Sequence, residues 1–154
     1  MKMTELAKSF ESLKLKNVKT FIASGNVIFE SSEKQTSITK KIETELSKLR
    51  GYKVDVMLRT SPEVQSIVKN KMTDSATVKN YVVFLSDELK SEGKKWLLSL
   101  NDPLNVVKLK NREICVVHRA IIGKPLFPSN FEKKMGIRAT IRSYSMLKRL
   151  SQTL

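Results

Sequence analysis

The sequence predicts a mixed α+β fold built from two halves with a similar order of elements. Residues 18–31 (VKTFIASGNVIFES) contain two apolar-alternating runs around Gly25-Asn26, which is typical of a tight β-hairpin. A second pair of such runs surrounds Asn111-Arg112. Segments with apolar residues at helical spacing flank both hairpins. The length of 154 residues and the apolar fraction of 40% suit a folded chain of one or two domains.

Two helices are expected to flank the first hairpin. The first covers residues 5–15, where apolar side chains recur at helical spacing. The second covers residues 33–50 and ends at Gly51, because glycine readily adopts the left-handed conformation that follows a helix. Their buried stripes consist of Leu6, Phe10 and Leu13 in the first helix and of Ile38, Ile42, Leu46 and Leu49 in the second.

The faces of the first hairpin follow from pairing across its turn. Such pairing places one apolar set on the core side, namely Val18, Ile22, Val27 and Phe29. The opposite face mixes aromatic, aliphatic and charged residues, as an open sheet that stacks nucleic-acid bases does. Phe21 is the single aromatic residue on that face, so packing within the protein is favoured over base stacking.

A strand and a short helix are predicted to complete the first half. Residues 52–59 (YKVDVMLR) alternate apolar and polar side chains. Ser61 then caps a helix that has Pro62 in its first turn.

A polar stretch without periodicity separates the halves, and we place a linker there at residues 71–77. The first half then covers residues 1–70 and the second covers residues 78–154. The second half is predicted to contain a strand at 78–86, a helix at 88–100, strands at 106–110 and 113–118, a helix at 129–135, a strand at 138–142 and a last helix bearing Leu147, Leu150 and Leu154.

The predicted order in the second half is the split βαβ pattern of ferredoxin-like folds. The first half has the same order without its opening strand. Because that strand takes a central place in such a sheet, its absence leaves neighbouring strands with unpaired backbone groups. Either the two halves share a sheet, or sequence upstream of Met1 supplies the strand. We therefore predict two ferredoxin-like halves, the first lacking its opening strand.

At the first hairpin the chain resembles a known bacterial family. Residues 2–31 (KMTELAKSFESLKLKNVKTFIASGNVIFES) are similar to the family catalogued as domain of unknown function 1697. Further similar segments are residues 54–63 (VDVMLRTSPE), 132–136 (EKKMG) and 139–150 (ATIRSYSMLKRL). The resemblance implies a pair of ferredoxin-like modules and implies no reaction.

The sequence departs from this family in three places. Family members usually begin with a strand and a glycine-rich loop, Leu-Arg-Gly-Ile-Asn-Val-Gly-Gly, which would precede Met1. If that loop binds an anion through its backbone N–H groups, residues 1–154 lack the part that would do so, and we expect either a truncation or a miscalled start. The family's Ser-Lys-hydrophobic-Thr-Asn stretch is replaced near Lys124 by KPLFPSN, and its Thr-Arg-Asn-Trp appears as IRSY, in which only Arg142 matches.

The net charge of +14 is concentrated near the C-terminus. Residues 104–154 contain eleven Lys and Arg against two Asp and Glu. Such a surplus favours a polyanionic partner such as nucleic acid, although many small proteins without such a partner are also basic. The candidate anion-binding residues are Arg119, Lys124, Lys133, Lys134, Arg138, Arg142, Lys148 and Arg149.

These features favour a binding module for an anionic partner. The alternative is a protein-interaction or self-association module that uses the unpaired sheet edge. Lys108 beside Cys115 could activate the thiol, but a lone strand cysteine is usually a small buried residue, and His118 is expected on the opposite face. We expect no catalytic residue, no metal and no cofactor, since one Cys and one His cannot form a zinc site and the glycines occur singly.

The sequence also predicts where the protein resides. No apolar stretch approaches the roughly 20 residues of a membrane helix. Glu5 and Ser9 interrupt what would be the apolar core of a secretory signal. The single cysteine agrees with a reducing compartment, so we predict a cytoplasmic protein.

Overall fold

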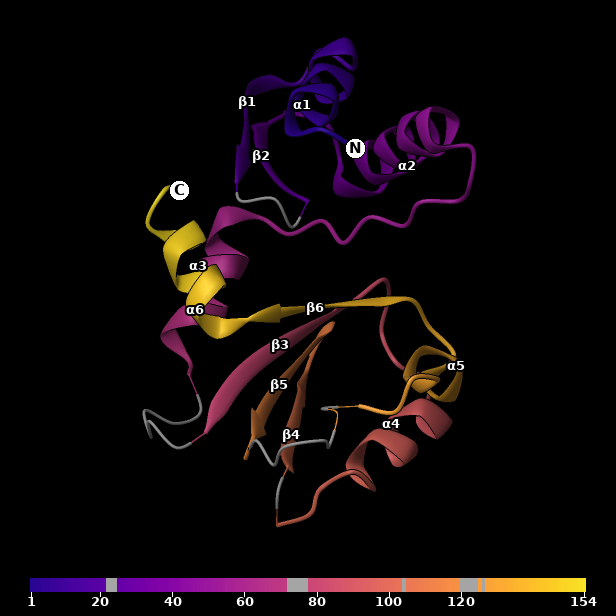
Figure 1. The fold of residues 1–154 in the computed structure, drawn as a ribbon, viewed down its shortest axis with the longest axis vertical. Coiled ribbons are helices and arrows are strands. Elements are labelled where there is room, and N and C mark those ends of the chain that lie inside the picture. Colours follow the sequence, from indigo (N-terminus) through magenta and orange to yellow (C-terminus); the bar gives the residue numbers. More distant parts are fainter. Residues whose placement is uncertain (22–24, 72–77, 104, 120–124, 126) are drawn as a thin grey trace. The chain divides into compact units, whose positions relative to one another are not determined.

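A computed structural model of the protein describes residues 1–21, 25–71, 78–103, 105–119, 125 and 127–154 (Figure 1). The chain forms two compact units, Met1–Leu58 and Arg59–Thr153, each with its own hydrophobic core. This division lies ahead of the predicted linker, whose residues 72–77 are outside the described part. The predicted mixed α+β class is confirmed. None of the helices described here is long and apolar enough to cross a membrane.

The first unit consists of two helices packed on a hairpin. Its elements are α1 (Met3–Ser12), β1 (Lys16–Phe21), β2 (Asn26–Glu30) and α2 (Gln35–Arg50). As predicted, Gly51 follows α2 with a left-handed φ of +73°. The core contains Leu6, Phe10, Leu15, Ile38, Ile42 and Leu46, and Val18, Val27, Phe29, Val54, Val56 and Leu58 pack against it. The predicted core face of the hairpin is thus confirmed for its described residues.

The turn of the first hairpin differs from the prediction. Phe21 pairs with Asn26, so the turn predicted at Gly25-Asn26 is wrong, and residues 22–24 lie outside the described residues. Gly25 does have the positive φ of +77° that a tight turn requires. Asn26 already belongs to β2, and its side-chain amide donates to the carbonyl of Phe21 at 3.3 Å. The predicted core residue Ile22 lies outside the described residues.

The predicted strand at residues 52–59 is not observed, because this segment pairs with none of the strands that the structure describes. The backbone N–H of Val54 donates to Oγ of Ser47 at 2.9 Å. The N–H of Val56 donates to Oε1 of Glu43, also at 2.9 Å. Side chains of α2 therefore accept the hydrogen bonds that a neighbouring strand would otherwise accept. The apolar alternation serves core packing here and not a strand ladder.

The second unit contains a four-stranded antiparallel sheet in the order β4-β5-β3-β6. The strands that the structure describes form two sheets, one in each unit. The elements of this unit are α3 (Ser61–Lys69), β3 (Lys79–Leu85), α4 (Ser91–Leu98), β4 (Asn105–Lys110), β5 (Glu113–His118), α5 (Phe131–Met135), β6 (Ala139–Ser143) and α6 (Tyr144–Ser151).

Helices pack on both faces of this sheet (Figure 1). On one face Val83 of β3 lies in a core with Leu97 of α4 and Met135 of α5. The next residue along the strand points to the other face. There Val82 lines a small hollow with Tyr144 at the start of α6, and α6 packs against α3. The helix pairs α4–α5 and α3–α6 therefore cover opposite faces of the sheet.

Candidate anion-binding surface

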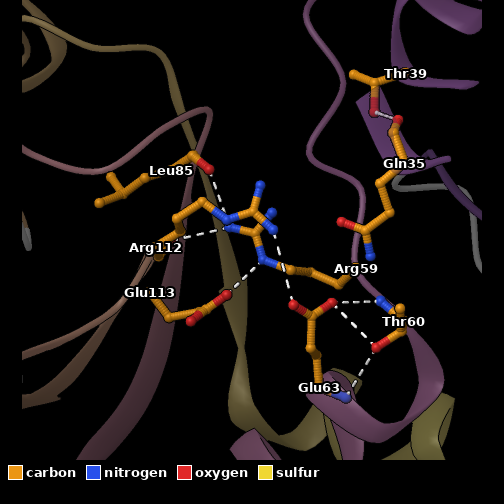
Figure 2. Close-up of polar contacts among 8 residues, drawn as sticks. All are labelled: Gln35, Thr39, Arg59, Thr60, Glu63, Leu85, Arg112 and Glu113. Atoms are coloured by element: carbon orange, nitrogen blue, oxygen red, sulfur yellow. Dashed lines mark hydrogen bonds and ion pairs between the residues drawn. The ribbon is translucent and has the colours of Figure 1, made fainter. Parts of the chain in front are cut away.

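The two carboxylates in residues 104–154 are both engaged by the protein itself. Glu113 is 8% exposed and forms an ion pair with Arg59 (Figure 2). Glu132 lies 3.6 Å from the guanidinium of Arg138. Neither carboxylate is therefore available to neutralise the other cations of this basic segment.

Most cations of the basic segment are exposed. Those that are exposed and form no ion pair with a described residue include Lys108 and Lys110 on β4, Lys133 and Lys134 on α5, and Lys148 and Arg149 on α6. Their charges remain available to an external anion, because no carboxylate of the described chain neutralises them.

Helices α4 and α5 approach so closely that only glycine fits at position 93. A Cβ atom on Gly93 would lie 2.7 Å from the backbone oxygen of Met135. Two exposed lysines follow Gly93 in α4, and two exposed lysines precede Met135 in α5. All four are exposed and lie within two residues of the contact along their helices. We call this group the α4–α5 lysine cluster: Lys94, Lys95, Lys133 and Lys134.

Half of this cluster was missed in the sequence analysis. Lys133 and Lys134 were predicted, but Lys94 and Lys95 lie in residues 61–103, where six Lys and Arg balance six Asp and Glu. The sequence did contain one signal of the contact between these helices, which is the glycine at position 93. Glycine inside a helix costs about 1 kcal/mol relative to alanine and often marks a close packing contact.

The predicted residues do not converge on one surface. Lys133 and Lys134 lie on α5, which covers the same face of the sheet as α4. Lys148 and Arg149 lie on α6, which packs with α3 on the opposite face. The structure thus separates two basic pairs that the sequence analysis had grouped.

The remaining predicted residues are bound within the protein or lie outside its described part. Nη1 of Arg119 donates to the backbone oxygen of Pro103 at 3.3 Å. Arg138 is paired with Glu132. Lys124 lies outside the described residues.

Arg142 is the most enclosed of the predicted cations that the structure describes. Its Nη1 donates to Oγ1 of Thr140 at 2.7 Å and to the backbone oxygen of Ile141 at 3.0 Å. Burial lowers the pKa of its guanidinium from the ordinary value. Arginine remains protonated near neutral pH even so, and here its Nη1 is directed to two acceptors of the same strand.

Comparison with known proteins identifies the family. Residues 1–114 match the family described as "Protein of unknown function (DUF1697)". The chain belongs to this family. The resemblance stated from the sequence is confirmed, and most of the basic segment lies beyond the matched residues.

A similar fold occurs in a solved structure. It is that of the conserved bacterial protein SP0830 from Streptococcus pneumoniae, with a TM-score of 0.74 and 17% sequence identity. The match covers 100% of this chain and 89% of that chain. No curated protein matches the chain. At this identity the likeness shows the fold alone, and the DUF1697 family is one of unknown function.

The single cysteine of this DUF1697 protein is held as a neutral thiol. Burial and the nearby carboxylate of Glu113 raise the pKa of Cys115, and Lys110 and Lys108 oppose this only in part. A nucleophilic cysteine requires the opposite shift. His118 lies on the other face of the hairpin, as predicted, and its Nδ1 is 2.6 Å from Oδ1 of Asn105. The two side chains therefore cannot act as a nucleophile and its base.

Two side chains that line the hollow between α3, α6 and the sheet already contact other groups of the protein. The hydroxyl of Tyr144 donates to the backbone oxygen of Val68 at 2.6 Å. The ammonium group of Lys71 lies 4.8 Å from the centre of the same ring. Within the described residues, no group of three or more His, Cys, Asp and Glu could hold a metal ion. The described part of this DUF1697 chain does offer exposed cations to a ligand.

Proposed function

We propose that this DUF1697 protein is a binding module for an anionic partner, with nucleic acid as the favoured polyanion. One observation carries the proposal. Both carboxylates of residues 104–154 are engaged, by Arg59 and by Arg138, while exposed cations of the same segment have no ion-pair partner among the described residues. Such cations attract phosphate groups and displace the counterions of a nucleic acid.

The α4–α5 lysine cluster is the contact surface that we favour. The close approach at Gly93 brings together the two helices that carry these four exposed lysines. Lysine ammonium groups are compact charges that bind phosphate without a fixed geometry. Phosphate contacts carry no sequence information, so we expect binding that depends little on base sequence.

The other predicted cations would contribute long-range attraction. They are Arg119, Lys124, Arg138, Arg142, Lys148 and Arg149. Cations distributed over two faces raise the association rate with a polyanion even where they make no lasting contact. Binding would take place in the cytoplasm, where the single Cys115 remains reduced.

We also infer that both units are ferredoxin-like. The order β3, α4, β4, β5, α5, β6 and the antiparallel sheet β4-β5-β3-β6 support this for the second unit. The order α1, β1, β2, α2 supports it for the first unit, without an opening strand.

Charge reversal on the two helices tests the proposal. Binding of fluorescein-labelled single-stranded RNA and duplex DNA is measured by anisotropy at low ionic strength. The variant K133E/K134E alters the lysine cluster, and K148E/R149E makes the same change in charge on α6. We expect the first variant to weaken binding by about tenfold and the second to weaken it less. Equal losses would remove the assignment to the cluster, and no binding by the unaltered protein would overturn the proposed function.

A further inference from the structure

The surface at the C-terminal end of α2 is exposed over six consecutive residues. These residues, 48–53 (KLRGYK), include three cations, and none of them is acidic. Tyr52 is 57% exposed, and every other aromatic residue of the described chain is buried or half-buried. Leu49 beside it is 52% exposed. An accessible aromatic ring and several cations thus occur together on the first unit.

Gly51 places Tyr52 beside Arg50. Its left-handed φ of +73° turns the chain at the end of α2. Nε and Nη2 of Arg50 donate to the hydroxyl of Tyr52 at 2.9 Å and 2.6 Å. The central carbon of the guanidinium lies 5.2 Å from the centre of the ring. These contacts orient the ring before a ligand arrives, so less conformational entropy is lost when one binds.

Arg50 retains hydrogen-bond donors for a ligand. A guanidinium has five N–H donors, and two of those of Arg50 donate to the hydroxyl of Tyr52. Neither Arg50 nor Lys48 forms an ion pair with a described residue. Lys53 pairs with Asp55 at 3.2 Å. Arg50 can therefore bind a phosphate group while it still holds the ring.

The end of a helix does not by itself account for these cations. Basic residues are favourable there, because the C-terminus of a helix carries a partial negative charge of about half a unit. Lys48 and Arg50 both lie in the last turn of α2. Their two full charges exceed that partial charge, so positive charge is left to attract an anion.

The surface suits a nucleic acid better than a lipid membrane. The apolar stripe of α2, formed by Ile38, Ile42 and Leu46, is buried in the core of the first unit. Helices that lie on a membrane insert such a stripe into the lipid, and α2 has none to offer. A nucleotide instead presents a flat base and a phosphate. An exposed ring with neighbouring cations matches both groups.

We propose that Tyr52 stacks on an unpaired base of a single-stranded nucleic acid, with Arg50 and Lys48 on its phosphates. This inference rests on the proposed binding of nucleic acid and adds a preference for single strands. Bases inside a duplex stack on each other, so the ring reaches only an unpaired base. Stacking tolerates any base, since each has a flat face. The site belongs to the first unit, and the α4–α5 lysine cluster belongs to the second.

An abasic strand separates stacking from charge. The probes are a fluorescein-labelled thymidine oligomer and an abasic oligomer of the same length, which has the same phosphates without bases. Anisotropy at low ionic strength measures the affinity for each. We expect the thymidine oligomer to bind about tenfold more tightly. Tyr52→Ala should abolish this difference and leave the affinity for the abasic oligomer unchanged.

Two further variants serve as controls. Tyr52→Phe retains the ring and should retain most of the preference for the strand with bases. Val106→Ala truncates another exposed apolar side chain, on β4, and should leave both affinities unchanged. Circular dichroism verifies that each variant is folded. In addition, an oligomer that contains 5-iodouracil should crosslink under ultraviolet light to a peptide that contains Tyr52, as identified by mass spectrometry.

The possible failures are distinguishable. Equal affinity for the two oligomers would overturn the stacking site but leave binding by phosphate contacts in place. A preference for bases that persists in Tyr52→Ala, or a crosslink to another residue, would also overturn it. Binding to phosphatidylglycerol vesicles that Tyr52→Ala abolishes, without a preference between the oligomers, would assign the surface to a membrane. No binding of either oligomer would overturn the proposed function itself.

Discussion

Arg59 and Glu113 form a buried ion pair that joins the start of α3 to the four-stranded sheet (Figure 2). Their side chains are 3% and 11% exposed. Nη2 of Arg59 also donates to the backbone oxygens of Leu85 at 2.9 Å and Arg112 at 3.0 Å. The guanidinium lies 5.5 Å from the centre of the Phe84 ring. A buried charge without partners costs free energy. The hydrogen bonds and the ring contact offset part of the cost of burying this pair.

Removal of Arg59 should therefore destabilise the second unit strongly. Arg59→Met leaves the carboxylate of Glu113 buried without its cation, which costs about 3–5 kcal/mol in comparable pairs. Urea unfolding measures the loss. The double variant R59M/E113L should recover part of the stability, since it removes both charges. A single-variant loss below about 1 kcal/mol would contradict a buried, interdependent pair.

Gly93→Ala should also destabilise the protein. In an open helix this substitution stabilises by about 1 kcal/mol, because alanine has the higher helix propensity. Here the added methyl group would lie 2.7 Å from the backbone oxygen of Met135, so α4 and α5 must move apart at a cost of about 1–3 kcal/mol. The sign of the change in thermal unfolding is the measurement. The control Lys94→Ala, at the next and exposed position, should be nearly neutral, and a stabilised Gly93→Ala variant would show that the helices are not in close contact.

Cys115 should react slowly with alkylating reagents. Burial first and Glu113 second raise its pKa above the ordinary value, so the thiolate fraction near neutral pH is smaller than that of a free thiol. Mass spectrometry of iodoacetamide labelling against pH should give a midpoint above that of the urea-unfolded chain. The same shift makes the folded state less stable as pH rises above the unfolded pKa, because the native thiol retains its proton. Labelling faster in the folded state would contradict the assignment of an inert thiol.

Local signals in the sequence predicted much of the fold. The second hairpin forms as predicted, with Lys110 opposite Glu113 and a positive φ at Asn111. Gly51 and Gly136 end α2 and α5 in the left-handed conformation that glycine adopts freely. These features depend on residues close in sequence, and for this reason a single sequence was sufficient to predict them.

Features that depend on distant contacts were not predicted. Apolar and polar residues alternate at 52–59, and this alternation does not distinguish a strand in a sheet from an extended segment. Here the N–H groups of the extended segment donate to Ser47 and Glu43 and not to a neighbouring strand. One local feature was also predicted wrongly, since Thr60 and not Ser61 caps α3 and Glu63 completes a capping box with Thr60. The lysine cluster required the contact of Gly93 with α5, which joins two regions of different charge composition.

The dependence of RNA affinity on salt concentration is the most direct test of anion binding. Anisotropy titrations of a labelled single-stranded RNA are repeated as the salt concentration rises from low to physiological. If the four lysines of the α4–α5 cluster contact phosphates, the logarithm of the association constant should fall against that of the salt concentration with a slope of about −3. The K133E/K134E variant should give a slope smaller in magnitude. A slope near zero, or no binding at the lowest salt concentration, would contradict the proposal that this DUF1697 protein binds a polyanion.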